Sequence, residues 1–295
     1  MKIRFGIELV LAFSFLGLGT AANAHKSGVN VQGNLSTGVD RPLHRQDSFG
    51  LDYTSYDFRG IVALNNCSGS IVRYDDSNDT DRALVLTNGH CVDLIDPGVV
   101  YLNRRSSRKF NILSEDASVL GSVRASRLLY ATMTKTDLAL YELRKTYKEI
   151  AQEFDIDPLT LAREAASTGE NIEVISGYWK MGYSCQLEAY VHQLKEGKWD
   201  FENSLRYSRP GCLVKGGTSG SPIIAEGTRT VIGVNNTGNE SGKKCTLNNP
   251  CEINEAGDVF YQKGYSYGQQ TVWLYGCRDD DGGLDLGVDG CELPQ

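Results

Sequence analysis

The sequence predicts an all-β protein, either a sandwich or a barrel, in two β-rich halves that flank a short helical connector. From Gly60 onward, apolar runs of strand length alternate with turn residues, and long helical patterns are few. Short strands at regular spacing are typical of sandwiches and barrels rather than of a parallel α/β sheet. No internal repeat is visible, which argues against a solenoid or a propeller.

Each half is defined by its apolar runs. In the first half, the predicted strands are residues 61–64, 70–74, 83–87, 99–102, 126–131 and 138–143. In the second half, they are residues 172–176, 187–193, 222–225, 231–234 and 259–261. Between the halves, Tyr147, Ile150 and Phe154 lie at helical spacing, and Pro158 opens a second predicted helical turn at 159–162. This connector lacks the basic face that a DNA-reading helix pair would need.

The N-terminus has the pattern of a secretory signal. Lys2 and Arg4 precede an apolar run at 7–18, and Ala22-Asn23-Ala24 has the small-x-small form of a cleavage site. No later segment reaches the roughly 18 consecutive apolar residues of a transmembrane helix. We therefore expect a secreted protein, extracellular or periplasmic, with no membrane span.

These patterns divide the chain into six segments. They are a signal peptide at 1–24, a pro-segment or N-terminal arm at 25–58, the first β-rich half at 59–144, the helical connector at 145–168, the second β-rich half at 169–265, and a C-terminal tail with a disulfide loop at 266–295. The acidic run 279–285 in the tail lacks the ligand spacing of an EF-hand, so it predicts a solvated loop rather than a calcium site.

The chain has eight cysteines, which in an exported protein predict disulfides. Their spacing suggests two short local loops and two longer ones, although spacing alone does not fix the connectivity. The suggested pairs are Cys245 with Cys251, Cys277 with Cys291, Cys67 with Cys91, and Cys185 with Cys212. No C-x-x-C pair is present and no histidine lies at ligand spacing from a cysteine, so we expect no metal and no cofactor.

The composition of the chain limits the classes of partner that we expect. The formal net charge is −7, so nucleic acid is not an expected partner. The hydrophobic content of 40% is ordinary for a globular core, and the 295 residues are enough for an enzyme.

One of the four histidines stands out as a candidate general base. His25 lies at the predicted mature terminus, His44 in the irregular arm, and His192 within an alternating strand pattern. His90 instead ends an apolar strand at a turn and is followed at once by Cys91. A rigid strand end next to a disulfide would hold an imidazole well.

A glycine-rich turn offers the matching nucleophile. Residues 216–222 read G-G-T-S-G-S-P and precede an apolar strand. Glycines on both sides of Ser219 allow tight backbone conformations, so the N–H groups of Gly217 and Ser219 are expected to form an oxyanion hole. The turn is not a P-loop, since no lysine follows it, and Ser221 excludes the G-x-S-x-G elbow.

Asp137 completes a predicted triad. It opens the apolar strand 138–143, where a buried carboxylate requires a partner. His90 can be that partner, and its imidazole would then take the proton of a serine hydroxyl. Asp93 and Asp116 are rivals, but neither opens a clean strand, and Asp93 is too near His90 in the chain to approach it from another strand.

Three stretches, T-N-G-H-C at 87–91, T-D-L-A-L at 136–140 and G-T-S-G-S-P at 217–222, resemble the His, Asp and Ser motifs of the trypsin-like, chymotrypsin-fold serine proteases. Their order is also that of the family. The stretch C-S-G-S-I-V at 67–72 resembles the strand whose cysteine bridges to the one beside the catalytic histidine. The resemblance covers roughly 60–265. Gly220-Ser221 and residues 231–234 look most like the bacterial branch that includes glutamyl endopeptidases.

The resemblance implies two antiparallel six-stranded β-barrels with the active site in the cleft between them. By this resemblance, 59–144 would be the first barrel, with His90 and Asp137, and 169–265 the second, with Ser219. Thr218 departs from the family, because many members carry an aspartate there that pairs with a newly freed N-terminal amine. Activation by that ion pair is therefore not expected, although removal of part of 25–58 could still unmask the cleft.

Substrate-binding positions also follow from the resemblance. Leu213 stands where trypsins carry an acidic residue, which argues against a simple preference for Arg or Lys. Asn235 stands where glutamyl endopeptidases carry a histidine, which argues against a preference for Glu. Backbone groups of Asn236, Thr237 and Gly238 are expected to pair with an extended substrate. The carboxylates of Glu240 or Asp258 could enter the pocket and change this preference.

The sequence thus predicts a monomeric, secreted serine endopeptidase that acts on polypeptides through an acyl-enzyme. Two alternatives remain open: a secreted esterase with the same triad, and a non-catalytic binding protein on a protease scaffold. The complete set of His, Asp, Ser and glycines argues against the second of these.

Overall fold

The computed structural model describes residues 45–46, 52–53, 56–207 and 211–295. The predicted signal peptide, most of the N-terminal arm, His25 and His44 lie outside these residues. The chain divides into two compact units, 1–41 and 42–295, and every described residue belongs to the second. At its start, β1 (Arg45–Gln46) pairs antiparallel with β2 (Asp52–Tyr53).

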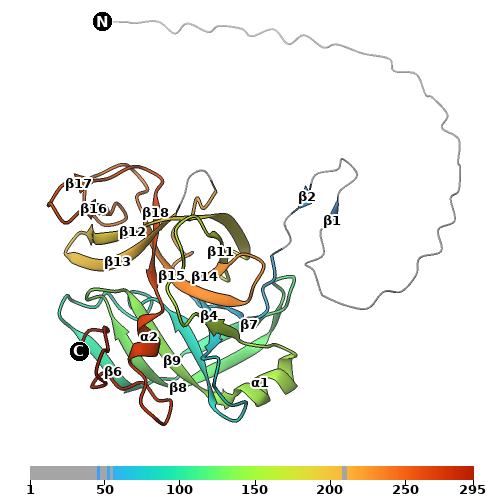
Figure 1. The fold of residues 1–295 in the computed structure, drawn as a ribbon. Helices are drawn as coiled ribbons and strands as arrows, with labels where there is room; N and C mark the ends of the chain where they lie inside the picture. The colour runs from blue at the N-terminus through green and yellow to red at the C-terminus, as the bar shows by residue number, and fades with distance from the viewer. Residues whose placement is uncertain (1–44, 47–51, 54–55, 208–210) are drawn as a thin grey trace, which may run out of the picture. The chain divides into compact units, whose positions relative to one another are not determined.

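Six antiparallel strands of the first half close into a ring. The ring forms the lower part of the ribbon in Figure 1. They are β3 (Ile61–Ala63), β4 (Ser68–Arg73), β5 (Arg82–Thr87), β7 (Lys109–Leu113), β8 (Val119–Thr132) and β9 (Leu138–Thr146). The order around the ring is β4-β3-β7-β8-β9-β5, and β5 pairs back onto β4. A further strand, β6 (Val100–Arg105), pairs with the second part of β8.

A second closed ring of six antiparallel strands follows. Its members are β11 (Asn171–Ser176), β12 (Met181–Glu196), β13 (Trp199–Tyr207), β14 (Pro222–Ala225), β15 (Thr230–Gly238) and β18 (Ser266–Gln270). The order is β14-β11-β12-β13-β18-β15, and β14 pairs back onto β15. The short strands β16 (Cys251–Ile253) and β17 (Val259–Phe260) extend the sheet from β12. The last ring strand, β18, lies beyond residue 265, in the segment that the sequence assigned to the tail.

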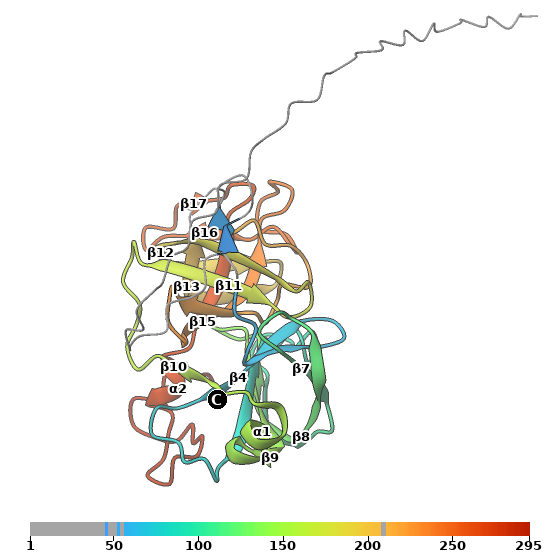
Figure 2. The ribbon, with the colours of Figure 1, turned by 90° about the vertical axis from the view of Figure 1, so that its right-hand side faces the viewer.

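The connector contains one helix and one strand. Helix α1 (Tyr147–Phe154) begins with a capping box between Thr146 and Glu149 and packs against β9 (Figure 2). The second helical turn predicted after Pro158 is wrong, because residues Leu159–Leu161 form strand β10. This strand pairs in parallel with β4 of the first ring and with β15 of the second, and such long-range pairing overrides the local pattern. A short helix, α2 (Trp273–Gly276), follows β18.

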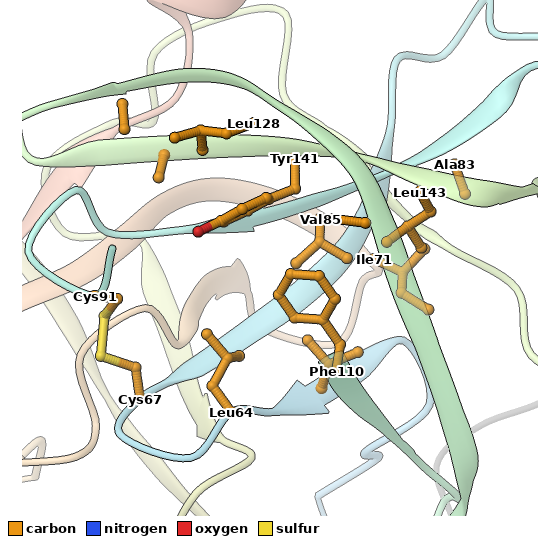
Figure 3. Packing of buried hydrophobic residues seen from close by; sticks show 14 of the residues in the cluster. Leu64, Cys67, Ile71, Ala83, Val85, Cys91, Phe110, Leu128, Tyr141 and Leu143 are labelled. Atoms are coloured by element: carbon orange, nitrogen blue, oxygen red, sulfur yellow. A yellow bond between two sulfur atoms is a disulfide. The ribbon is translucent and has the colours of Figure 1, made fainter. Parts of the chain in front are cut away.

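Each ring has an apolar interior, and the cluster that fills the first ring continues into the second through Leu194, Trp199 and Phe201. In the first, Ile71, Val85 and Leu143 surround the edge-to-face pair of Phe110 and Tyr141, whose ring centroids are 5.3 Å apart (Figure 3). The second is filled by buried side chains of its strands, which include Ile172, Val174, Leu187, Leu205, Tyr207 and Ile223. A third cluster joins residues of both rings to the C-terminal segment, among them Ile61, Leu86, Leu140, Leu161, Val234, Trp273, Leu274 and Leu293. The two rings therefore share a common hydrophobic contact.

Four disulfides join the cysteines in the pairs that their spacing suggests. They are Cys67–Cys91, Cys185–Cys212, Cys245–Cys251 and Cys277–Cys291. Among the described residues, no helix is both long enough and apolar enough to cross a bilayer.

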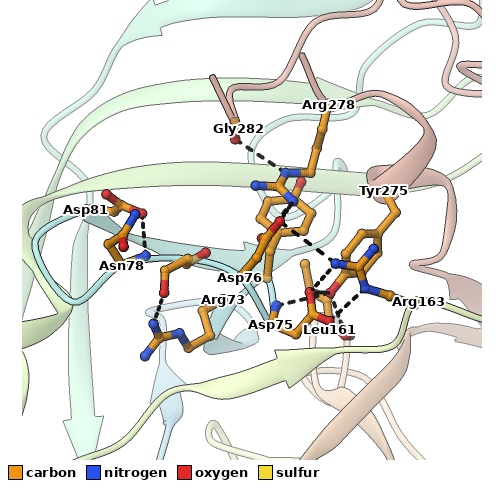
Figure 4. Close-up of polar contacts among 12 residues, drawn as sticks. Arg73, Asp75, Asp76, Asn78, Asp81, Leu161, Arg163, Tyr275, Arg278 and Gly282 are labelled. Carbon is orange, nitrogen blue, oxygen red and sulfur yellow. Dashed lines mark hydrogen bonds and ion pairs between the residues drawn. The ribbon is translucent and has the colours of Figure 1, made fainter. Parts of the chain in front are cut away.

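Ion pairs attach the C-terminal segment to the turn that follows β4. Arg278 donates to both carboxylate oxygens of Asp76 at 2.8 and 3.0 Å, and Arg163 from the connector binds Asp75 at 2.7 and 2.9 Å (Figure 4). The hydroxyl of Tyr275 also donates to Asp75, at 3.1 Å. Three separate parts of the chain thus meet at one turn of the first ring.

Candidate active site

His90 lies in the turn that ends β5. The preceding residue must be glycine, because a Cβ atom on Gly89 would overlap the carbonyl oxygen of Thr132. The next residue, Cys91, is bonded to Cys67, which directly precedes β4. A strand end, a close backbone contact and a disulfide therefore fix the position of the imidazole.

Asp137 holds His90 through two contacts. Its Oδ2 lies 2.6 Å from Nδ1 of His90, and its Oδ1 accepts the backbone N–H of His90 at 3.0 Å. The carboxylate is 1% exposed, directly before β9, and Asn88 donates to its backbone carbonyl at 2.8 Å. With Nδ1 engaged by the carboxylate, Nε2 is the ring nitrogen left for proton exchange.

These neighbours also set the charge of the imidazole. Burial acts to lower the pKa of His90, but the charge and hydrogen bond of Asp137, with a smaller contribution from Glu196, outweigh it, and the pKa of His90 is raised above its ordinary value. A protonated His90 is thus stabilised by carboxylates, as an imidazolium formed during a proton transfer would be.

Ser219 lies in a tight turn between β13 and β14. Gly217 and Gly220 have φ angles of 91° and 81°, which glycine adopts without strain. The turn is tied to both rings: the N–H of Gly220 donates to the carbonyl of Asn235 at 2.9 Å, and the N–H of Ser68 donates to the carbonyl of Ser219 at 2.8 Å. Within the described structure, the Ser219 hydroxyl donates to the carbonyl of Asn236 at 3.2 Å.

The same turn presents two backbone donors. The N–H groups of Gly217 and Ser219 have no acceptor among the described residues, whereas those of Thr218, Gly220 and Ser221 are all engaged. Unengaged N–H groups of a serine and of the glycine two positions before it can stabilise an oxyanion formed at that serine.

One cleft of about 550 Å³ brings the predicted residues together. His90, Asp137 and Ser219 line it, as do all the predicted substrate-binding residues, Leu213, Asn235, Asn236, Thr237 and Gly238. Its lining comes from both rings, so the cleft lies between them. Leu213 is 57% exposed there, which gives the cleft an accessible apolar surface.

Other candidates lie elsewhere. Asp93 accepts the N–H of Leu94, and Asp116 accepts the hydroxyl of Ser114, so among the described contacts neither pairs with His90. His192 and Asp258 line a different pocket, whereas Glu240 does line the cleft.

The cleft contains one acidic residue that the sequence reasoning missed. Glu196 ends β12 with its side chain buried, lines the cleft near His90, and accepts the N–H of Asn248 at 2.7 Å. A signal for it exists in the strand alternation, since Leu194 and Glu196 share one face of β12 and both are buried.

A grouping of Cys67, His90 and Cys91 has ligand atoms within 4.8 Å of one another. Both sulfur atoms belong to one disulfide, so they are not thiolates and this group does not form a metal site.

Comparison with known proteins finds one matching family model and several similar solved structures. A family model described as the trypsin-like peptidase domain matches residues 67–234, more than half of the chain. Solved structures that are similar include the MamO protease domain of Magnetospirillum magneticum, with 14% identity, coverage of 72% of this chain and 92% of that chain, and a TM-score of 0.41. A Nocardiopsis protease has 14% identity, with coverage of 73% of this chain and 92% of that chain and a TM-score of 0.43. A Glu endopeptidase has 15% identity, with coverage of 72% of this chain and 85% of that chain and a TM-score of 0.40. Comparison with curated protein sequences finds no match.

Two closed antiparallel rings of six strands, with a cleft between them, define a protein of the chymotrypsin fold. The chain belongs to the family of trypsin-like peptidase domains. The predicted fold class and the predicted family are thus both confirmed.

Proposed function

We propose that the protein is a secreted serine endopeptidase in which His90, Asp137 and Ser219 form the catalytic triad. The observation that carries this proposal is the 2.6 Å contact between His90 Nδ1 and a buried carboxylate oxygen of Asp137, in the same cleft as Ser219. Membership of the peptidase family supports hydrolysis of peptide bonds. The disulfides and the signal-like N-terminus support export.

In the proposed reaction, an extended substrate pairs with the backbone of 236–238 and places its scissile carbonyl at Ser219. The serine hydroxyl leaves the carbonyl of Asn236 and turns to Nε2 of His90, which takes its proton as the hydroxyl oxygen attacks. The N–H groups of Gly217 and Ser219 bind the oxyanion, and loss of one such donor typically costs about 10²–10³ in rate.

Collapse of the tetrahedral intermediate breaks the peptide bond. His90 gives its proton to the leaving amine, and the acyl group remains on the oxygen of Ser219. A water molecule then attacks the ester while His90 accepts its proton, and the proton returns to Ser219 as the acid product leaves. Asp137 keeps His90 in the required tautomer and stabilises its imidazolium form in both the acylation and the deacylation steps.

The turn around Ser219 needs no N-terminal ion pair in this proposal. Thr218, which replaces the usual aspartate, is fully buried, its hydroxyl accepts the N–H of Lys215 at 3.3 Å, and its N–H donates to the Lys215 carbonyl at 3.0 Å. Phe58 is buried and Asp57 binds Arg229 at 3.0 Å, so this end of the arm belongs to the folded domain. Any removal of the arm would therefore cut before residue 56.

The test compares two serines of the same turn. Ser219→Ala is expected to abolish casein hydrolysis and labelling by a phosphonate reagent. Ser221→Ala is a matched control, because Ser221 is fully buried and its hydroxyl has no hydrogen-bond partner among the described residues. This control should remain active, whereas casein hydrolysis by Ser219→Ala would refute the proposal. Hydrolysis of esters without peptides would instead identify an esterase.

A further inference from the structure

A buried carboxylate without a cation lies in the wall of the cleft. The side chain of Glu196 is 6% exposed, and the ion pairs among the described residues include none to it. The half-buried carboxylate of Glu252, by contrast, binds Arg206 at 2.9 Å. An acidic group this deeply buried is stabilised best by an opposite charge, whereas its hydrogen-bond partners Asn248 and Thr237 bring none, and its open side is the cleft itself.

The surroundings of Glu196 combine two hydrogen bonds, from Asn248 and Thr237, with apolar surface. Oε1 accepts the N–H of Asn248, which orients the carboxylate. Leu94, Met133 and Trp199 line the same cleft, and the indole N–H of Trp199 is already engaged with the carbonyl of Ile95 at 2.7 Å. A ligand group that fits must therefore bring an apolar stem together with a positive charge.

Burial, the largest influence, raises the pKa of Glu196 above its ordinary value, although the N–H of Asn248, a hydrogen bond from Thr237 and the attraction of His90 act to lower it. A cation that entered the cleft would also act to lower the pKa of Glu196 and so favour its carboxylate form. Low local dielectric would strengthen that attraction relative to one at the surface.

We propose that Glu196 forms a subsite for a cationic side chain, lysine or arginine, of the peptide substrate. This inference rests on the proposed function and adds the substrate class that the cleft prefers. Leu213 supplies apolar surface to the same cleft and carries no charge, so the charge preference is assigned to Glu196. The aliphatic stem of a lysine or arginine packs against apolar surface while its charged end reaches the carboxylate.

The anchoring of Asn248 and the binding of a cation can be separated by one substitution. Glu196→Gln keeps an oxygen that accepts the N–H of Asn248 but removes the charge. Lysine and norleucine share an unbranched stem and differ in charge, so a general effect on His90 changes both kinds of peptide equally. The matched control is Glu255→Gln, which removes an exposed carboxylate that lies outside this cleft.

The experiment measures kcat/KM for fluorogenic peptides with lysine or norleucine placed in turn at each of the four positions before the cleaved bond. We expect wild-type enzyme to prefer lysine by about tenfold or more at one position, since ion pairs desolvated in binding sites contribute on this scale. Glu196→Gln should bring the two peptides to within about threefold of each other. Glu255→Gln should keep the preference.

A wild-type enzyme with no lysine preference at any position, or a preference that persists in Glu196→Gln, would overturn the inference. Inhibition by acetyl-lysine amide against acetyl-norleucine amide gives a second readout on the wild-type chain, in case the variant does not fold; equal inhibition would also overturn it. If the inference is overturned in this way, the proposed function is still supported when the wild type cleaves norleucine peptides and Ser219→Ala does not. Absence of all peptide cleavage by the folded wild type would refute both.

Discussion

Removal of the Cys67–Cys91 disulfide is expected to destabilise the protein by an amount that the loop length sets. The bond closes a loop with a sequence separation of 24 and joins the start of β4 to the residue after His90. In the chain-entropy model, a loop of about 25 residues corresponds to about 3.5 kcal/mol at 25 °C. The double variant Cys67→Ala/Cys91→Ala should therefore lose about that much of its free energy of unfolding, with kcat lowered because the turn of His90 loosens.

A shorter loop in the same chain provides the comparison. Cys245–Cys251 has a separation of 6, for which the same model gives about 2.3 kcal/mol. Urea unfolding of the oxidised proteins, followed by tryptophan fluorescence, measures both losses against wild type. The reasoning predicts that the long loop costs more, by about 1.2 kcal/mol. An equal loss in the two double variants, or a larger one for the short loop, would refute it.

Four further outcomes follow from the site and the core. Because the pKa of His90 is raised and the neutral imidazole is the base, kcat/KM should rise with pH through a midpoint above about 6.5, and a midpoint below that value would contradict the assignment. Asp137→Asn should lower kcat by about 10⁴-fold with little change in the free energy of unfolding. Fixed-time casein hydrolysis measures the first quantity and urea unfolding the second. Gly220→Ala should destabilise the fold by more than about 1–2 kcal/mol, since φ is 81° and a Cβ atom there would overlap the carbonyl oxygen of Ser68; a neutral effect on the thermal midpoint would be inconsistent with the described turn. Phe110→Ala, which empties the centre of the first ring, should cost about 3–5 kcal/mol in urea unfolding, and a loss below about 1 kcal/mol would show that the ring collapses around the gap.

The residues of the proposed triad were accessible from the sequence because each signal is short. An apolar strand that stops at a histidine, an aspartate that opens another strand, and a glycine-rich turn can each be read within about ten residues. What such patterns do not contain is the distance between them. The contact between His90 and Asp137 depends on the pairing of β5 with β9, which is a property of the closed ring.

Polar strands and long-range strands escaped prediction for physical reasons. Strand β18 reads S-Y-G-Q-Q, and its glutamines are buried because they bond to other strands; Gln269 donates to Ser204 at 3.1 Å. Apolar periodicity cannot find such a strand. Strands β7 and β13 also fell outside the predicted runs, and β10 was assigned to a helix because its partners lie far away in the chain.

Glu196 escaped for a related reason. The stretch K-E-G-K around it reads as a solvated hairpin turn, and nothing local shows that residues near Asn248 cover it. Strand alternation places Glu196 on the same face as Leu194, but whether a charged side chain on that face is buried depends on the loop that returns over it.

The cluster shared by the rings has a consequence for the order of folding. It contains Ile61, from the first strand of the first ring, together with Leu274 and Leu293, from the segment that follows the second ring. Contacts between residues so far apart in the chain require a large loop to be closed before they contribute any stability. We therefore expect this part of the core to form late, after the strands within each ring have paired.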